Sequence, residues 1–81
     1  MATFKCDIKQ QFGKYQVWAW KASERQGDVL AADLSDAKVA TEQILGALKK
    51  GGFGEGDEVI FRSVAYASLG ELRGVLTRAP Y

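Results

Sequence analysis

Residues 3–21, TFKCDIKQQFGKYQVWAWK, contain the pattern that decides the fold. In the first half, the apolar side chains alternate with polar ones, and they are Phe4, Cys6 and Ile8. Alternation with a period of two is typical of a strand with one buried face. The second half, from Tyr15 on, is rich in the aromatic and β-branched residues that strands favour. Gly13, which can adopt a positive φ, separates the halves, so the segment predicts a β-hairpin.

The length of the hairpin turn decides which face of the second strand joins the buried face of the first. A two-residue turn at Phe12 and Gly13 places both tryptophans, Trp18 and Trp20, on the face that carries the lysines. A three-residue loop ending at Gly13 instead places Trp18 opposite Cys6. A slip of one residue exchanges the two faces completely. We expect the three-residue loop, because glycine at the last loop position is a common hairpin solution.

The middle of the chain predicts a short strand followed by the main helix. Residues 28–32 have the composition of a third strand after a polar connection. Ser35 then precedes apolar residues at helical spacing that continue to Leu48, so we expect Ser35 to be the helix N-cap. The glycine-rich segment 51–56 could suggest a phosphate-binding loop. It follows a helix instead of preceding one, however, which predicts a plain connection to the next strand.

The last third of the chain predicts one strand and one short helix. Residues 58–65 include a continuous apolar run typical of a buried strand, in which Arg62 is out of place. The spacing of Ser68 and Glu71 is that of a capping box, which begins a helix. We therefore predict a single α+β domain, residues 1–81, with the order strand-strand-strand-helix-strand-helix. Its antiparallel sheet of three to four strands would pack on one main helix.

The composition excludes several classes of function. The chain has no histidine and one cysteine, Cys6, so Ser-His-Asp and Cys-His catalysis and a Cys/His metal site within one chain are ruled out. We expect no catalytic residues, no cofactor and no metal, and hence no enzyme. A single cysteine is typical of a reducing compartment, which favours the cytoplasm, and Cys6 is expected to be a buried, inert thiol. Apolar runs are too short to cross a membrane.

The strongest candidate for a binding surface is the second strand of the hairpin, because both of its faces are apolar. One of the two faces belongs to the core in either register. The other is free for a partner or for a second copy of the chain. We expect Trp18 or Tyr15 to be the aromatic anchor of such a surface. The complete candidate set is Lys5, Lys9, Lys14, Tyr15, Trp18 and Trp20.

Two resemblances bear on function. Residues 13–50, which begin Gly-Lys-Tyr-Gln-Val-Trp-Ala-Trp and reach a helix starting near Asp36-Ala37-Lys38, resemble AP2-like domains, including those of phage integrases. That resemblance implies a three-stranded sheet that binds DNA through basic and aromatic side chains. This chain departs from the family in carrying few arginines in its strands and a net charge of only +1.

In type, the chain is similar to small phage-encoded inhibitors such as anti-CRISPR proteins, being short, free of histidine and α+β. This likeness implies a non-enzymatic protein that covers a surface of a larger host protein or complex in the host cytoplasm. Nucleic-acid binding through Lys5, Lys9, Lys14 and Lys21 is the alternative. A homodimer, with or without a small ligand at its interface, is a further possibility.

Overall fold

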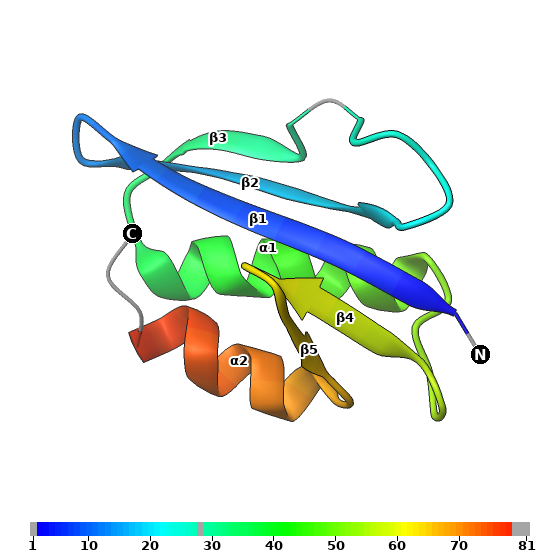
Figure 1. Ribbon diagram of the computed structural model, residues 1–81. Coiled ribbons are helices and arrows are strands. Elements are labelled where there is room, and N and C mark those ends of the chain that lie inside the picture. Colours follow the sequence, from blue (N-terminus) through cyan, green and yellow to red (C-terminus); the bar gives the residue numbers. More distant parts are fainter. Residues whose placement is uncertain (1, 28, 79–81) are drawn as a thin grey trace.

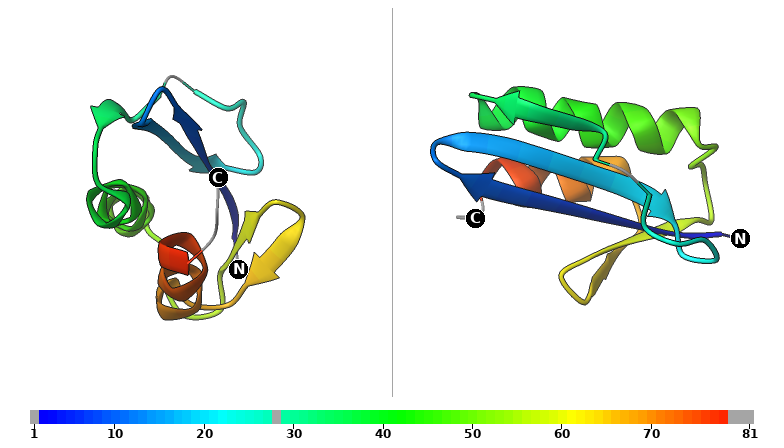
Figure 2. Two further views of the ribbon diagram at one scale, coloured as in Figure 1. Left: turned by 90° about the vertical axis from the view of Figure 1, so that its left-hand side faces the viewer. Right: turned by 90° about the horizontal axis from the view of Figure 1, so that it is seen from above.

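The computed structural model describes residues 2–27 and 29–78, and it contains a mixed sheet with two helices against one of its faces (Figures 1 and 2). The five strands lie in the order β3-β2-β1-β4-β5, with β1 in the centre. The α+β class is therefore confirmed. The elements are β1 (Thr3–Gln11), β2 (Lys14–Lys21), β3 (Ala31–Leu34), α1 (Ala37–Lys50), β4 (Glu58–Phe61), β5 (Val64–Tyr66) and α2 (Leu69–Arg78).

The sheet differs from the prediction in strand number and direction. β4 pairs with β1 in parallel, because helix α1 carries the chain back along the sheet before β4 begins. The predicted strand 58–65 is two strands, since Arg62 and Ser63 form a two-residue turn with φ values of 51° and 71°. An arginine–serine pair is not a usual turn signal, so alternation alone did not reveal the break. The prediction of an antiparallel sheet of three to four strands was therefore wrong.

The register of the β1–β2 hairpin is the one that we did not favour. Phe12 and Gly13 have φ values of 53° and 74° and form a two-residue turn, which sets Ile8 opposite Val17. Positive φ at both central positions is typical of a type I′ turn, whose backbone twist matches that of the strands. The expected three-residue loop is therefore wrong. Trp18 lies opposite Asp7 and Trp20 opposite Lys5, on the face away from the core.

The hydrophobic core lies between the sheet and the two helices. Cys6, expected to be buried, is indeed only 4 % exposed. Burial, together with the neighbouring charge of Asp7, raises the pKa of the thiol to about 12. Fully burying an apolar side chain of this kind of core contributes about 1.5–3 kcal/mol. The buried apolar residues are Phe4, Cys6, Ile8, Val17, Ala40, Ile44, Leu45, Leu48, Val59, Phe61, Leu72 and Leu76.

The helix boundaries differ by about one residue from those expected. Asp36, not Ser35, is the N-cap of α1, and its carboxylate accepts a hydrogen bond of 2.8 Å from the Lys38 amide. Both residues are good caps, so their order in the chain could not decide between them. The third strand begins at Ala31, later than predicted, and Asp28 lies outside the described residues.

Ser68 caps α2 as predicted, but the return bond of Glu71 reaches Ala67, one residue before the cap. The Glu71 amide donates to the Ser68 hydroxyl over 3.2 Å. The Glu71 carboxylate in turn accepts from the Ala67 amide over 3.1 Å. Two otherwise unpaired donors at the helix start are thereby satisfied.

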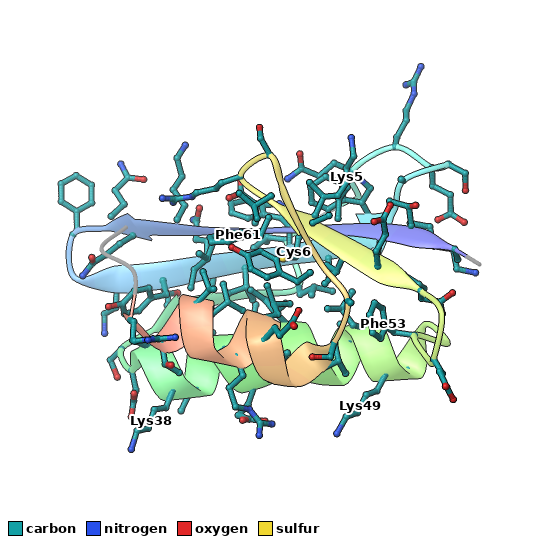
Figure 3. The ribbon with its side chains drawn as sticks, turned by 60° about the horizontal axis from the view of Figure 1, so that its bottom comes forward. Lys5, Cys6, Lys38, Lys49, Phe53 and Phe61 are labelled. Atoms are coloured by element: carbon teal, nitrogen blue, oxygen red, sulfur yellow. The ribbon has the colours of Figure 1, made fainter. Side chains whose placement is uncertain are left out.

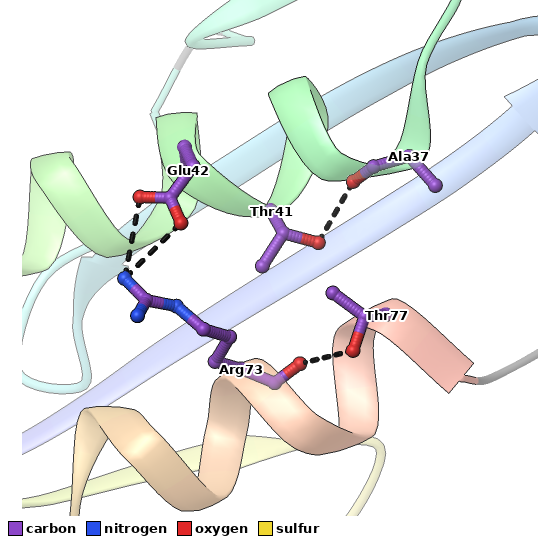
Figure 4. A network of polar contacts seen from close by, with 5 residues as sticks. All are labelled: Ala37, Thr41, Glu42, Arg73 and Thr77. Carbon is purple, nitrogen blue, oxygen red and sulfur yellow. Dashed lines mark hydrogen bonds and ion pairs between the residues drawn. The ribbon is translucent and has the colours of Figure 1, made fainter.

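The contact between α1 and α2 combines apolar packing with one ion pair (Figure 4). Arg73 and Glu42 approach to 3.1 Å, with side chains 51 % and 60 % exposed. An ion pair this exposed contributes at most about 1 kcal/mol. The Thr41 hydroxyl, which is buried, donates to the Ala37 carbonyl within α1 over 2.8 Å. Packing of Leu72 and the rest of the apolar face of α2 therefore accounts for most of the stability of this contact.

Candidate functional site

One face of the sheet carries no helix, since α1 and α2 both lie on the opposite side (Figure 2). Figure 3 shows Lys5 on the helix-free side and its neighbour Cys6 on the helix side, as strand alternation requires. We call the helix-free side the open sheet face. It includes Thr3, Lys5, Asp7, Lys9, Gln11, Lys14, Gln16, Trp18, Trp20, Glu58 and Ile60.

The two tryptophans form the apolar part of the open sheet face together with Ile60. Lys5 pairs with Trp20 on β2 and with Ile60 on β4, which gives a row of three side chains across three strands. Trp18 is the next residue on this face of β2. Both indoles are half-buried. The aliphatic stem of a lysine covers apolar neighbours while its ammonium group stays in water, so Lys5 combines shielding and charge in this row.

A shallow hollow of about 290 Å³ lies between β2 and the β4–β5 turn. Its polar lining includes Lys5, Asp7 and Arg62, and its apolar lining includes Trp20 and Ile60. This volume is at the lower limit of the roughly 300–1,000 Å³ of typical ligand pockets, and the hollow is shallow. The open sheet face is therefore better suited to contact with a large molecule than to enclosing a small one.

Two charged groups beside the open sheet face bond to the edge of β1. The pairing of β1 with β4 ends at Lys5, which leaves the following part of β1 without a neighbouring strand on that side. The Ile8 amide donates to the Asp7 carboxylate over 2.9 Å, and the Ile8 carbonyl accepts from Arg62 over 3.3 Å. These side chains satisfy backbone groups that an added strand would otherwise use. The Arg62 guanidinium also lies 5.1 Å from the centre of the Phe61 ring.

The part of the open sheet face around the tryptophans is modestly positive in character. Lys5, Lys9 and Lys14 are exposed on it and outnumber Asp7, which keeps its negative charge while it accepts a backbone hydrogen bond. Two further carboxylates, those of Glu58 and Asp33, lie toward the ends of the face. Arg62 was noted in the sequence as out of place in a buried strand. Its position in a turn beside this face explains why an arginine is tolerated there.

The structure brings together most, but not all, of the residues proposed for a binding surface. Lys5, Lys9, Trp18 and Trp20 lie on the open sheet face, with Lys14 at its hairpin end. Tyr15 lies on the other side of β2, beside Leu34, and packs against the core. Tyr15 is therefore not an anchor on this face. Lys21 is likewise displaced from it, because it lies opposite the buried Phe4.

Residues 2–27 and 29–78 contain neither a cluster of metal-ligating side chains nor a membrane-spanning helix. In this part of the chain no three or more His, Cys, Asp or Glu side chains group as a metal ion would require. Neither of its helices has the length and apolar character needed to span a membrane. Comparisons with protein-family models, with curated proteins and with solved structures found no match. The resemblances to AP2-like domains and to phage inhibitors therefore remain expectations from the sequence.

Proposed function

We propose that this protein is a non-enzymatic binding module that attaches to a larger protein through its open sheet face. The observation that supports this best is the two-residue hairpin turn, which sets Trp18 and Trp20 among lysines on the uncovered side of the sheet. Aromatic side chains within a polar surround supply most of the binding energy of small interfaces. In its narrower form, the proposal is a phage-encoded inhibitor that covers a surface of a host complex.

The charge of the face indicates the kind of protein surface that would fit it. Lys5, Lys9 and Lys14 surround the tryptophans and outnumber Asp7, the carboxylate between them. A complementary partner has acidic residues around an apolar centre. Such complementarity mainly speeds association and excludes wrong partners.

The test uses a photo-crosslinking amino acid in place of Gln16, at the middle of the open sheet face. After irradiation in the producing cells, the attached protein is identified, purified and titrated against variants by calorimetry. We expect Trp18→Ala to weaken binding by at least about 30-fold, the effect of a hot-spot residue. Lys49→Ala is the matched control, because Lys49 points away from the sheet on α1 (Figure 3). Undiminished affinity of a folded Trp18→Ala variant would refute the proposal.

Nucleic-acid binding by the same face is the second candidate. The specific observation in its favour is that Lys5 and Lys9 share a face with both tryptophans. Stacked aromatic rings and lysine–phosphate contacts are the usual means of binding single strands. Titration of the tryptophan fluorescence with a 15-nucleotide oligothymidine at two salt concentrations tests it. Affinity should fall steeply between about 50 and 200 mM salt, because counterions are released. An absent or salt-independent signal removes this candidate.

A further inference from the structure

Phe12, at the tip of the β1–β2 hairpin, is the most exposed large apolar residue of the described chain. Its side chain is 92 % exposed, so the phenyl ring contributes almost nothing to the core. The next most exposed, Val64, is 51 % exposed. A fully exposed phenyl ring leaves its apolar surface in water.

The backbone of Phe12 adds a second cost. Its φ is 53°, in the left-handed region that bulky side chains rarely adopt. The first position of a type I′ turn strongly prefers asparagine, aspartate or glycine, and asparagine before glycine is among the best turn sequences. Gly13 already supplies the second position. Folding alone would therefore favour asparagine over phenylalanine at position 12.

The hairpin tip is continuous with the open sheet face. Phe12 borders a hollow of about 220 Å³ that Lys14 and Gln16, both residues of that face, also line. Trp18 is six positions after Phe12 along β2, which corresponds to a distance of at most about 20 Å. A standard interface buries about 800 Å² on each partner, which is wide enough to cover both residues at once.

From these observations we infer that Phe12 is a protruding anchor, which inserts into an apolar pocket of the protein bound by the open sheet face. The inference rests on the proposed function and adds a second contact point to it. Lys14 and Asp33 both line the hollow beside Phe12, so the charges there balance and the pocket is expected to be chiefly apolar. Strain and exposure at a position where the fold does not need them are typical of a binding residue.

The decisive variant is Phe12→Asn, because it separates binding from folding. Asparagine relieves the strained turn, which should increase the folding equilibrium constant by up to about tenfold. In a domain of this size, such a gain raises Tm by roughly 4–8 °C. Affinity for the crosslinked protein should fall at least about tenfold. Phe12→Leu, which keeps an apolar side chain, should retain most of the affinity. Wild-type affinity of Phe12→Asn would overturn the inference.

The crosslinker placed at position 12 checks the same point without relying on stability. The inference is supported if positions 12 and 16 crosslink to the same protein and if Phe12→Asn binds that purified protein more weakly than wild type does. A product from position 16 but none from position 12 overturns this inference alone. A product of two copies of this chain, or of nucleic acid, at position 12 also overturns it. No protein product at either position overturns the proposed function as well.

Discussion

Asp57 is the residue through which the glycine-rich connection is tied to the start of the sheet. Its carboxylate accepts hydrogen bonds from the Ala2 amide over 2.7 Å and from the Gly54 amide over 2.9 Å. Nearby, the rings of Phe53 and Phe4 lie 5.4 Å apart. Residues 51–56, which were expected to be a plain connection, are therefore fixed by the Asp57 hydrogen bonds and by the contact between Phe53 and Phe4. The two amide hydrogen bonds, that of Ala2 first, lower the pKa of Asp57.

Acidification should release this tie. The folded-state pKa of Asp57 is lowered, so its contribution to stability is complete above the unfolded value of 3.8 and is lost as the pH falls through the folded value. We predict that Asp57→Asn lowers Tm near pH 6 and that the difference from wild type shrinks below pH 4. Thermal melts between pH 2.5 and pH 7 test this. Glu55→Gln, in the same connection, is the control, and a difference independent of pH would contradict the prediction.

At the scale of single elements, local patterns predicted the hairpin, α1 and the N-cap of α2. These elements are recognised from hydrophobic periodicity and from helix-capping residues, which are signals contained within a few neighbouring residues. Strand pairing was harder to predict. The β1–β4 ladder joins Thr3 to Glu58, far apart in the chain, and the division of β4 from β5 depends on an unusual turn at Arg62 and Ser63. Neither feature has a local signal in the sequence.

The candidate site was predictable in residue type but not in arrangement. Tryptophans and lysines on the hairpin are evident from the sequence, whereas their presence on one face depends on the type of turn at Phe12. The exclusion of Tyr15 from that face follows from the same turn. Because a register slip of one residue exchanges the faces, a small error in the turn moves the whole site.

Substitution of two glycines by alanine separates the effect of backbone conformation on stability from the effect of packing. A Cβ added at Gly46, in the middle of α1, or at Gly13, in the turn, would meet no atom within 4 Å. Gly13, however, has a φ of +74°. We predict that Gly46→Ala raises the free energy of unfolding by about 0.5–1 kcal/mol, the helix preference of alanine over glycine. Gly13→Ala should lower it. Urea unfolding measures both, and changes of equal sign would contradict the prediction.

On the scale of the whole molecule, Cys6 is a natural reporter of global opening. It lies on the central strand, it is 4 % exposed, and burial raises its thiol pKa to about 12. The thiolate is the reactive form, so native Cys6 should react with a disulfide reagent far more slowly than a free thiol at pH 8. Leu72→Ala, which opens a cavity costing about 2–5 kcal/mol, should speed the reaction by an order of magnitude or more. Rapid labelling of the native wild type would show that β1 opens locally.

The parallel pairing of β1 with β4 also has a consequence for synthesis. The hairpin of β1 and β2 is complete once the first 21 residues have left the ribosome, but the partner on the other side of β1 is residues 58–60. Until they emerge, the edge of β1 at Thr3–Lys5 is also unpaired, and unpaired strand edges promote aggregation of nascent chains. A chain stalled or cleaved between α1 and β4 should therefore aggregate, although it contains the entire hairpin with both tryptophans.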